Sequence, residues 1–80
     1  MKSFKIKLES AKDVSKFVSS VSQKPYDVDV QGSQTKFTVD AKSLMGLFTL
    51  DLTRELTVHV NSSVNDTNML KEEIQQFVVA

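Results

Sequence analysis

Hydrophobic and polar residues alternate in the first segment of the chain. Phe4, Ile6 and Leu8 are apolar, whereas the intervening Lys5 and Lys7 are charged. Side chains of a β-strand point alternately to its two faces, so this period of two predicts a strand with one buried face.

A helical period follows the first strand. Apolar residues recur at spacings of three and four, which marks one face of an α-helix; they are Val14, Phe17, Val18 and Val21. Pro25 comes next. Because proline disfavours the helical conformation of the residue before it, we expect the helix to end before this position.

Two further alternating runs are separated by turn residues. Tyr26, Val28 and Val30 alternate with Asp27 and Asp29, while Phe37 and Val39 alternate with Lys36, Thr38 and Asp40. Residues 31–34 (Gln-Gly-Ser-Gln) supply the turn chemistry. We therefore expect a β-hairpin whose second strand places Phe37 and Val39 on its apolar face.

The second half of the chain contains three more predicted elements. Residues 43–48 have room for one or two turns of helix, and Leu56, Val58 and Val60 predict a strand with Thr57, His59 and Asn61 facing outward. Met69, Leu70, Ile74, Phe77 and Val78 then follow a helical period. We expect Asp66 or Thr67 to cap this last helix.

The predicted order is βαββαβα, in a single domain that spans residues 1–80. Each strand has one apolar and one polar face, so we expect a four-stranded antiparallel sheet with three helices on one face. This is the open-faced β-sandwich of the α+β class. A ferredoxin-like fold shares the first six elements, but the short second helix and the extra C-terminal helix disfavour it.

The composition narrows the range of functions. Ten basic and ten acidic residues cancel, so the chain has no charge excess for nucleic acid or a membrane surface. No apolar run approaches the roughly 20 residues that cross a bilayer, and residues 1–5 do not have the apolar stretch of a signal peptide. Without cysteine, neither disulfides nor thiolate metal sites form. We expect a cytoplasmic protein without cofactors.

One segment carries a family resemblance. Residues 40–50 (Asp-Ala-Lys-Ser-Leu-Met-Gly-Leu-Phe-Thr-Leu) resemble the regulatory-serine segment of HPr, the histidine-containing phosphocarrier protein. Residues 4–6 fit the first strand of that family, residues 26–30 fit its second, and the resemblance extends from Phe4 to Phe77. It implies a single HPr-like domain. Members of the family pass a phosphoryl group from enzyme I to permease components of the sugar phosphotransferase system (PTS).

The chain departs from the family at the active centre. The family motif reads Gly-x-His-Ala-Arg-Pro-Ala, whereas residues 11–17 here read Ala-Lys-Asp-Val-Ser-Lys-Phe. Asp13 stands in place of the histidine, Ser15 in place of the arginine and Lys16 in place of the proline. The only histidine, His59, lies in the predicted fourth strand. The resemblance thus implies a divergent member that lacks the phospho-acceptor histidine.

Asp13 can be interpreted in two ways. An acyl phosphate on its carboxylate would be reactive enough to pass on, as a phosphohistidine is. However, a free carboxylate repels an incoming phosphoryl group, and the missing arginine removes a bidentate clamp. Aspartate is also a favoured helix N-cap. We expect Asp13 to be the N-cap of the first helix, and no residue to be catalytic.

Residues 43–48 contain the candidate regulatory and binding residues. Ser43 is expected to cap the short helix, and the resemblance implies that HPr kinase phosphorylates it, which makes the protein a corepressor of the catabolite control protein. We expect Leu44 and Leu47 to face the core and Met45 and Phe48 to be partly exposed, as in a docking surface. The resemblance implies that Met45, Gly46, Leu47 and Phe48 contact enzyme I, permease components, the kinase and the repressor.

The sequence therefore favours a non-enzymatic, HPr-like regulatory module that binds proteins and is switched at Ser43. Two alternatives stay open: a phosphocarrier that relays phosphate through Asp13, and an interaction domain unrelated to the PTS. We expect no metal site, because His59 has no second histidine or cysteine beside it. The acidic residues Asp27, Asp29 and Asp40 are expected to form a solvated sheet face.

Overall fold

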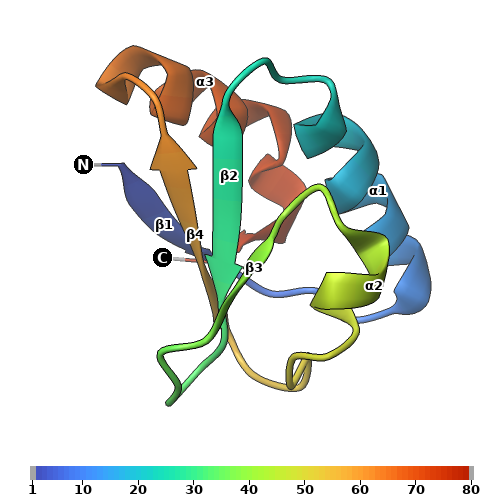
Figure 1. Cartoon of the computed structure of the whole chain (residues 1–80). Helices are drawn as coiled ribbons and strands as arrows, with labels where there is room; N and C mark the ends of the chain where they lie inside the picture. Colours follow the sequence, from blue (N-terminus) through green and yellow to red (C-terminus); the bar gives the residue numbers. More distant parts are fainter. Residues whose placement is uncertain (1, 80) are drawn as a thin grey trace.

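The structure is a computed structural model that describes residues 2–79. Its elements follow the order β1 (Ser3–Ile6), α1 (Ala11–Ser22), β2 (Asp27–Gln31), β3 (Thr38–Asp40), α2 (Leu44–Leu47), β4 (Leu56–Asn61), α3 (Val64–Glu73), the 3₁₀ turn η1 (Gln75–Phe77) and β5 (Val78–Val79). Figure 1 shows α1 and α3 lying on the same side of the sheet, with the short α2 beside α1. The predicted α+β open-faced sandwich is confirmed.

The strands form one antiparallel sheet in the order β3-β2-β4-β1-β5. The predicted hairpin of β2 and β3 is present, with Val30 opposite Val39. The sheet has five strands where we expected four. The last helix ends earlier than its apolar period suggests, and η1 turns the chain so that Val78 and Val79 pair with Ile6 and Lys5 of β1.

The core lies between the sheet and the helices. Its fully buried members include Phe17 of α1, Ile6 of β1 and Leu70 of α3, and the strands add Val28, Val30, Leu56 and Val58. Because strand side chains alternate, the residues between these point to the opposite, open face of the sheet. The open face is polar, so the helices cover one face only.

Three details differ from the sequence prediction. Phe37 is 77% exposed, because β3 begins only at Thr38 and the residue lies in the preceding loop. Leu44 is 41% exposed, since a four-residue helix buries one side chain here, that of Leu47. The cap of α3 is Ser63, not Asp66 or Thr67.

The start of α3 shows why the cap was misplaced. The hydroxyl of Ser63 accepts a hydrogen bond from the Asp66 backbone N–H at 3.0 Å, while the Asp66 carboxylate accepts one from the Ser62 hydroxyl. Thr67 lies inside the helix, where its hydroxyl donates to the Ser63 carbonyl at 2.9 Å. Serine, aspartate and threonine all favour helix starts, so composition alone does not identify the cap. Among residues 2–79 no helix has the length and apolar character needed to cross a membrane.

Candidate functional site

The start of α1 (residues 9–13) is closed by its own side chains. Ser10, not Asp13, is the N-cap: its hydroxyl accepts a hydrogen bond from the Asp13 N–H at 3.1 Å. The Asp13 carboxylate reaches back and accepts one from the Glu9 N–H at 3.0 Å. The expectation that Asp13 is the cap was wrong by three residues, because this Ser-x-x-Asp is a variant of the capping box.

This arrangement uses one of the N–H groups that could bind an anion. Free N–H groups at a helix start and the positive end of the helix dipole attract phosphate. In α1 the Asp13 N–H is bonded to Ser10, and the Asp13 carboxylate already places a negative charge at this end. Ser15, in the arginine position, is exposed and carries no charge. The carboxylate at this helix end therefore disfavours the approach of a second anion.

A hollow of about 370 Å³ adjoins the α1 start, lined by residues 7–11 together with Leu52 and Thr53. Its lysine is Lys7, whose Nζ donates a hydrogen bond to the Leu52 carbonyl at 3.1 Å. That bond ties β1 to the loop before β4. The lysine that lines this hollow is thus engaged in holding the loop.

His59 lies on the open face of the sheet. Its neighbours in β4, Val58 and Val60, are buried toward the helices, so the imidazole points to the other side. There its Nε2 is 2.8 Å from Gln31 Oε1. The sheet separates His59 from α1, so it does not replace a histidine at the α1 start. Within residues 2–79 no group of three His, Asp or Glu side chains is arranged to hold a metal ion.

Ser43 is the N-cap of α2, as expected. Its hydroxyl accepts a hydrogen bond from the Gly46 N–H at 3.1 Å, and the residue is half-buried. A Cβ on Gly46 would lie 3.1 Å from Ser43 Oγ and 3.3 Å from Val39 Cβ. Glycine at this position therefore lets α2 approach both the capping hydroxyl and β3.

The turn before Ser43 is fixed by hydrogen bonds. Asp40 Oδ1 accepts one from the Lys42 N–H at 2.9 Å, and the Asp40 carbonyl accepts one from the Ser43 N–H at 2.9 Å. The Lys42 ammonium donates to the Lys24 carbonyl at 2.8 Å, beyond the end of α1. These bonds hold Ser43 in one place relative to α1.

The α2 surface, which we define as the exposed side chains of Leu44, Met45 and Phe48, is apolar. Met45 is 80% exposed and Phe48 is 47% exposed, so both predictions of exposure are confirmed. Leu47 is fully buried and anchors the helix to the core. The α2 helix contacts α1, so this surface and the α1 start belong to the same side of the molecule (Figure 1).

The structure thus brings two candidate regions together and leaves His59 apart. Sequence reasoning missed Ser10 as the cap of α1 and Leu44 as part of the exposed surface. The first could have been found from the serine that precedes Asp13 by three residues. The second has no local signal, because the sequence of so short a helix does not show which of its two leucines faces the core.

Comparison with known proteins agrees with this geometry. A family model described as the PTS HPr component phosphorylation site matches residues 6–80. A solved structure of HPr-C-His from Thermoanaerobacter tengcongensis is similar with a TM-score of 0.73 and 18% sequence identity, over 95% of this chain and 92% of that one. No curated protein sequence matches the chain.

Proposed function

Because the chain belongs to the HPr family of phosphocarrier domains of the PTS, we propose that it is a member without relay activity, which binds partner proteins and is regulated at Ser43. The phosphoryl-accepting histidine of the family would be replaced by Asp13. The protein would act in the cytoplasm as a regulatory module, not as an enzyme.

The observation that carries this proposal is the hydrogen bonding of the α1 start. Asp13 accepts from the Glu9 N–H and donates its own N–H to Ser10, so both its carboxylate and its amide have structural partners. A phosphoryl transfer would have to bring an anion toward a carboxylate that no arginine neutralises. A structural role for Asp13 explains its contacts without such a step.

A second observation supports Ser43 as the switch. All three helices begin with a serine whose hydroxyl accepts from the N–H three residues later, at Asp13, Gly46 and Asp66. In α1 and α3 that third residue has a carboxylate, which would repel a phosphate on the serine. In α2 it is glycine, so a phosphoserine there meets no such charge. Among the three caps, Ser43 accommodates phosphate best.

The α2 surface supplies the binding function. Large apolar side chains that are exposed together mark docking sites, and Met45 and Phe48 lie two and five residues after Ser43 in the chain. Partners would bind over Met45, Phe48 and the exposed Leu44, beside Gly46. Leu47, which the resemblance also implies as a contact, is fully buried, so it would support this surface from the core side. We propose HPr kinase, a catabolite control repressor or PTS components as these partners, since each would contact both Ser43 and the α2 surface.

Two phosphorylation reactions test the proposal. The protein is incubated with phosphoenolpyruvate and enzyme I in one tube, and with ATP and HPr kinase in another, and its mass is then measured. Asp13→Asn keeps a hydrogen-bond acceptor for Glu9 but does not form an acyl phosphate. Ser43→Asn keeps a good N-cap but has no hydroxyl to phosphorylate. Loss of phosphate in either variant can therefore be assigned to the missing acceptor group and not to a change in folding.

We expect no added phosphate in the first tube and one in the second, lost in Ser43→Asn. Phosphate in the first tube that is lost in Asp13→Asn would favour the alternative, a phosphocarrier that uses Asp13. Two unmodified samples would favour the other alternative, an interaction domain unrelated to the PTS.

A further inference from the structure

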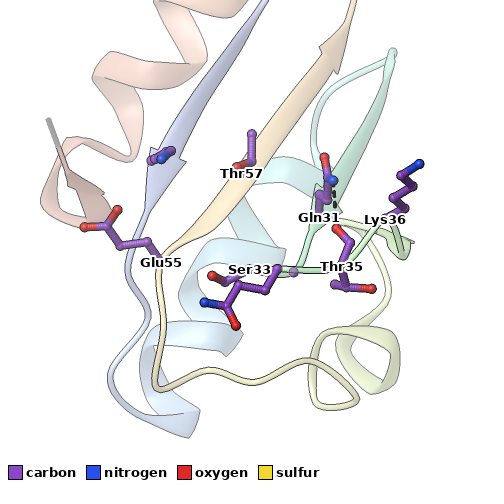
Figure 2. Close-up of a pocket in the computed structure, with 9 residues that line it drawn as sticks. Gln31, Ser33, Thr35, Lys36, Glu55 and Thr57 are labelled. Atoms are coloured by element: carbon purple, nitrogen blue, oxygen red, sulfur yellow. Dashed lines mark hydrogen bonds between the residues drawn. The ribbon is translucent and has the colours of Figure 1, made fainter.

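A second hollow lies on the open face of the sheet, away from α1 and α2. Its volume is about 550 Å³, within the range of about 300–1,000 Å³ for small-molecule sites. The floor is a row across three strands, in which Thr57 of β4 pairs with Gln31 of β2 and with Lys5 of β1. The loop between β2 and β3 forms one wall (Figure 2).

That loop is held in shape by its own hydrogen bonds. Gln31 Nε2 donates to the Thr35 carbonyl at 2.9 Å, and the Thr35 hydroxyl accepts from the Phe37 N–H at 3.1 Å. Gly32 is buried, and a Cβ at this position would lie 2.9 Å from Thr35 Cγ2. Glycine therefore allows the close contact between Gly32 and Thr35 that shapes the loop. The wall of the hollow is thus formed before any ligand arrives.

Gln34, which lines the hollow, has a left-handed backbone with φ of 60°. This conformation costs a non-glycine residue on the order of 1 kcal/mol, and glycine would adopt it more readily. Backbone strain of this kind is concentrated at functional sites. The residue at this position is nonetheless glutamine, which adds an amide group to the lining of the hollow.

The lining identifies the class of ligand. Most small-molecule sites are largely apolar, but here the wall and floor present amide and hydroxyl groups, from Ser33, Gln34, Thr35 and Thr57. The Gln31 amide is already hydrogen-bonded to Thr35 and His59, so it shapes the floor of the hollow. Amide and hydroxyl groups both donate and accept hydrogen bonds. A molecule with several neighbouring hydroxyl groups matches them, whereas an apolar molecule does not.

The charged residues at the rim add a second argument. Lys36 and Glu55 flank the hollow on opposite sides, and Lys5 also lines it. Within residues 2–79 none of the three takes part in a salt bridge. Opposite charges at the rim offer donors and acceptors to hydroxyl groups without favouring a strongly charged ligand.

We propose that this hollow binds a small, neutral polyhydroxylated molecule of the sugar or cyclitol class. The site lies on the sheet face opposite the helices, so a ligand here leaves the α2 surface free for a protein partner. This function goes beyond the proposed role of Ser43 and does not depend on it.

Backbone amide NMR with ¹⁵N-labelled protein tests the proposal. D-glucose and myo-inositol are the neutral probes, and inorganic phosphate is the anionic probe. We expect saturable shifts at the amides of Gly32, Ser33 and Gln34 with a Kd on the order of 1–10 mM for at least one neutral probe, because an open site makes few contacts.

Variants assign those shifts to the hollow. Thr57→Val removes a hydroxyl with little change of shape and should weaken binding at least threefold. Gln34→Gly should also weaken binding although it relieves the strained backbone, which a purely structural role of Gln34 would not predict. Asn61→Ala changes the same strand outside the hollow and should bind as the native protein does.

The proposal is overturned if neither neutral probe gives saturable shifts at these amides. Equal affinity in the native protein and Thr57→Val would also overturn it, as would saturable binding of phosphate alone. The amide spectrum of each variant shows whether it is folded.

Discussion

The starts of α1 and α2 have the same capping bond and opposite consequences. In each, a serine hydroxyl accepts from the N–H three residues later, at 3.1 Å in both cases. In α1 the third residue is Asp13, whose carboxylate accepts a hydrogen bond from the Glu9 N–H just before the helix. In α2 the third residue is Gly46, which has no side chain, and the start stays beside an exposed apolar surface.

The residue three positions after the cap decides what each of these helix starts can accept. An aspartate there satisfies local N–H groups and interacts favourably with the helix dipole, so it stabilises the fold. The same carboxylate repels a second anion. Glycine gives up that stabilisation and leaves room for a charged modification.

The largest expected effect concerns the anchor of α2. Leu47 is fully buried, so Leu47→Ala should lower the free energy of unfolding by about 2–5 kcal/mol. Leu44→Ala, at a 41% exposed position of the same helix, should cost less than about 1 kcal/mol. Urea unfolding measures both, and equal losses would contradict the assigned orientation of α2.

Exchanging the third residue tests the comparison itself. Gly46→Asp gives α2 the same Ser-x-x-Asp start as α1, while Gly46→Asn introduces nearly the same bulk without charge. We expect HPr kinase to phosphorylate Ser43 about tenfold more slowly in Gly46→Asp than in Gly46→Asn, because two negative groups then lie close together. Equal rates in the two variants would show that charge at this position does not matter.

The caps should contribute similar stability. Ser10→Ala and Ser43→Ala each remove a capping hydroxyl and should lower the free energy of unfolding by about 1 kcal/mol. Asp13→Ala should cost about as much, since it removes the acceptor of the Glu9 N–H and a charge that favours the helix dipole. Chemical denaturation measures these losses. A neutral Asp13→Ala would contradict the structural role of that carboxylate.

The smallest effect concerns the far end of α1, where Lys24 forms a salt bridge with Glu73. The hydrogen bond to Glu73 raises the pKa of Lys24 above its ordinary 10.5, and burial raises the pKa of Tyr26 above 10.0. A group whose pKa is higher in the folded state than in the unfolded state stabilises the folded state. That contribution is complete at pH values below the unfolded-state pKa and is lost as the pH rises through the folded-state pKa.

We therefore expect the free energy of unfolding to fall above about pH 10, by some tenths of a kcal/mol from the partly exposed ion pair. Lys24→Met and Tyr26→Phe should each flatten this alkaline loss, as measured by unfolding at several pH values. Neither change should affect Ser43 phosphorylation, because both alter side chains only and the Lys24 group that Lys42 contacts is the backbone carbonyl.

Much of the fold follows from the sequence because its periods are clear. The four longer strands and three helices were predicted from alternation and helical spacing, as was the exposure of Met45 and Phe48. The two-residue β5 was missed, since Val78 continues the apolar spacing of α3 and nothing local marks the turn after Glu73. Phe37 was assigned to the buried face, although β3 starts one residue later.

The candidate site was only partly predictable. The position of Asp13 near the α1 start came from the family motif, but its hydrogen bond to Glu9 depends on side-chain geometry that spacing does not show. The hollow on the open face was missed altogether, because its lining comes from three segments that meet only in the folded sheet.

The most direct test of the closed α1 start is the mass of the native protein after incubation with phosphoenolpyruvate and enzyme I. Asp13→His, which returns the family's residue to this position, serves as the comparison. The account predicts no phosphate on the native chain at any enzyme concentration that modifies the histidine variant. Phosphate on the native chain that is absent from Asp13→Asn would contradict it.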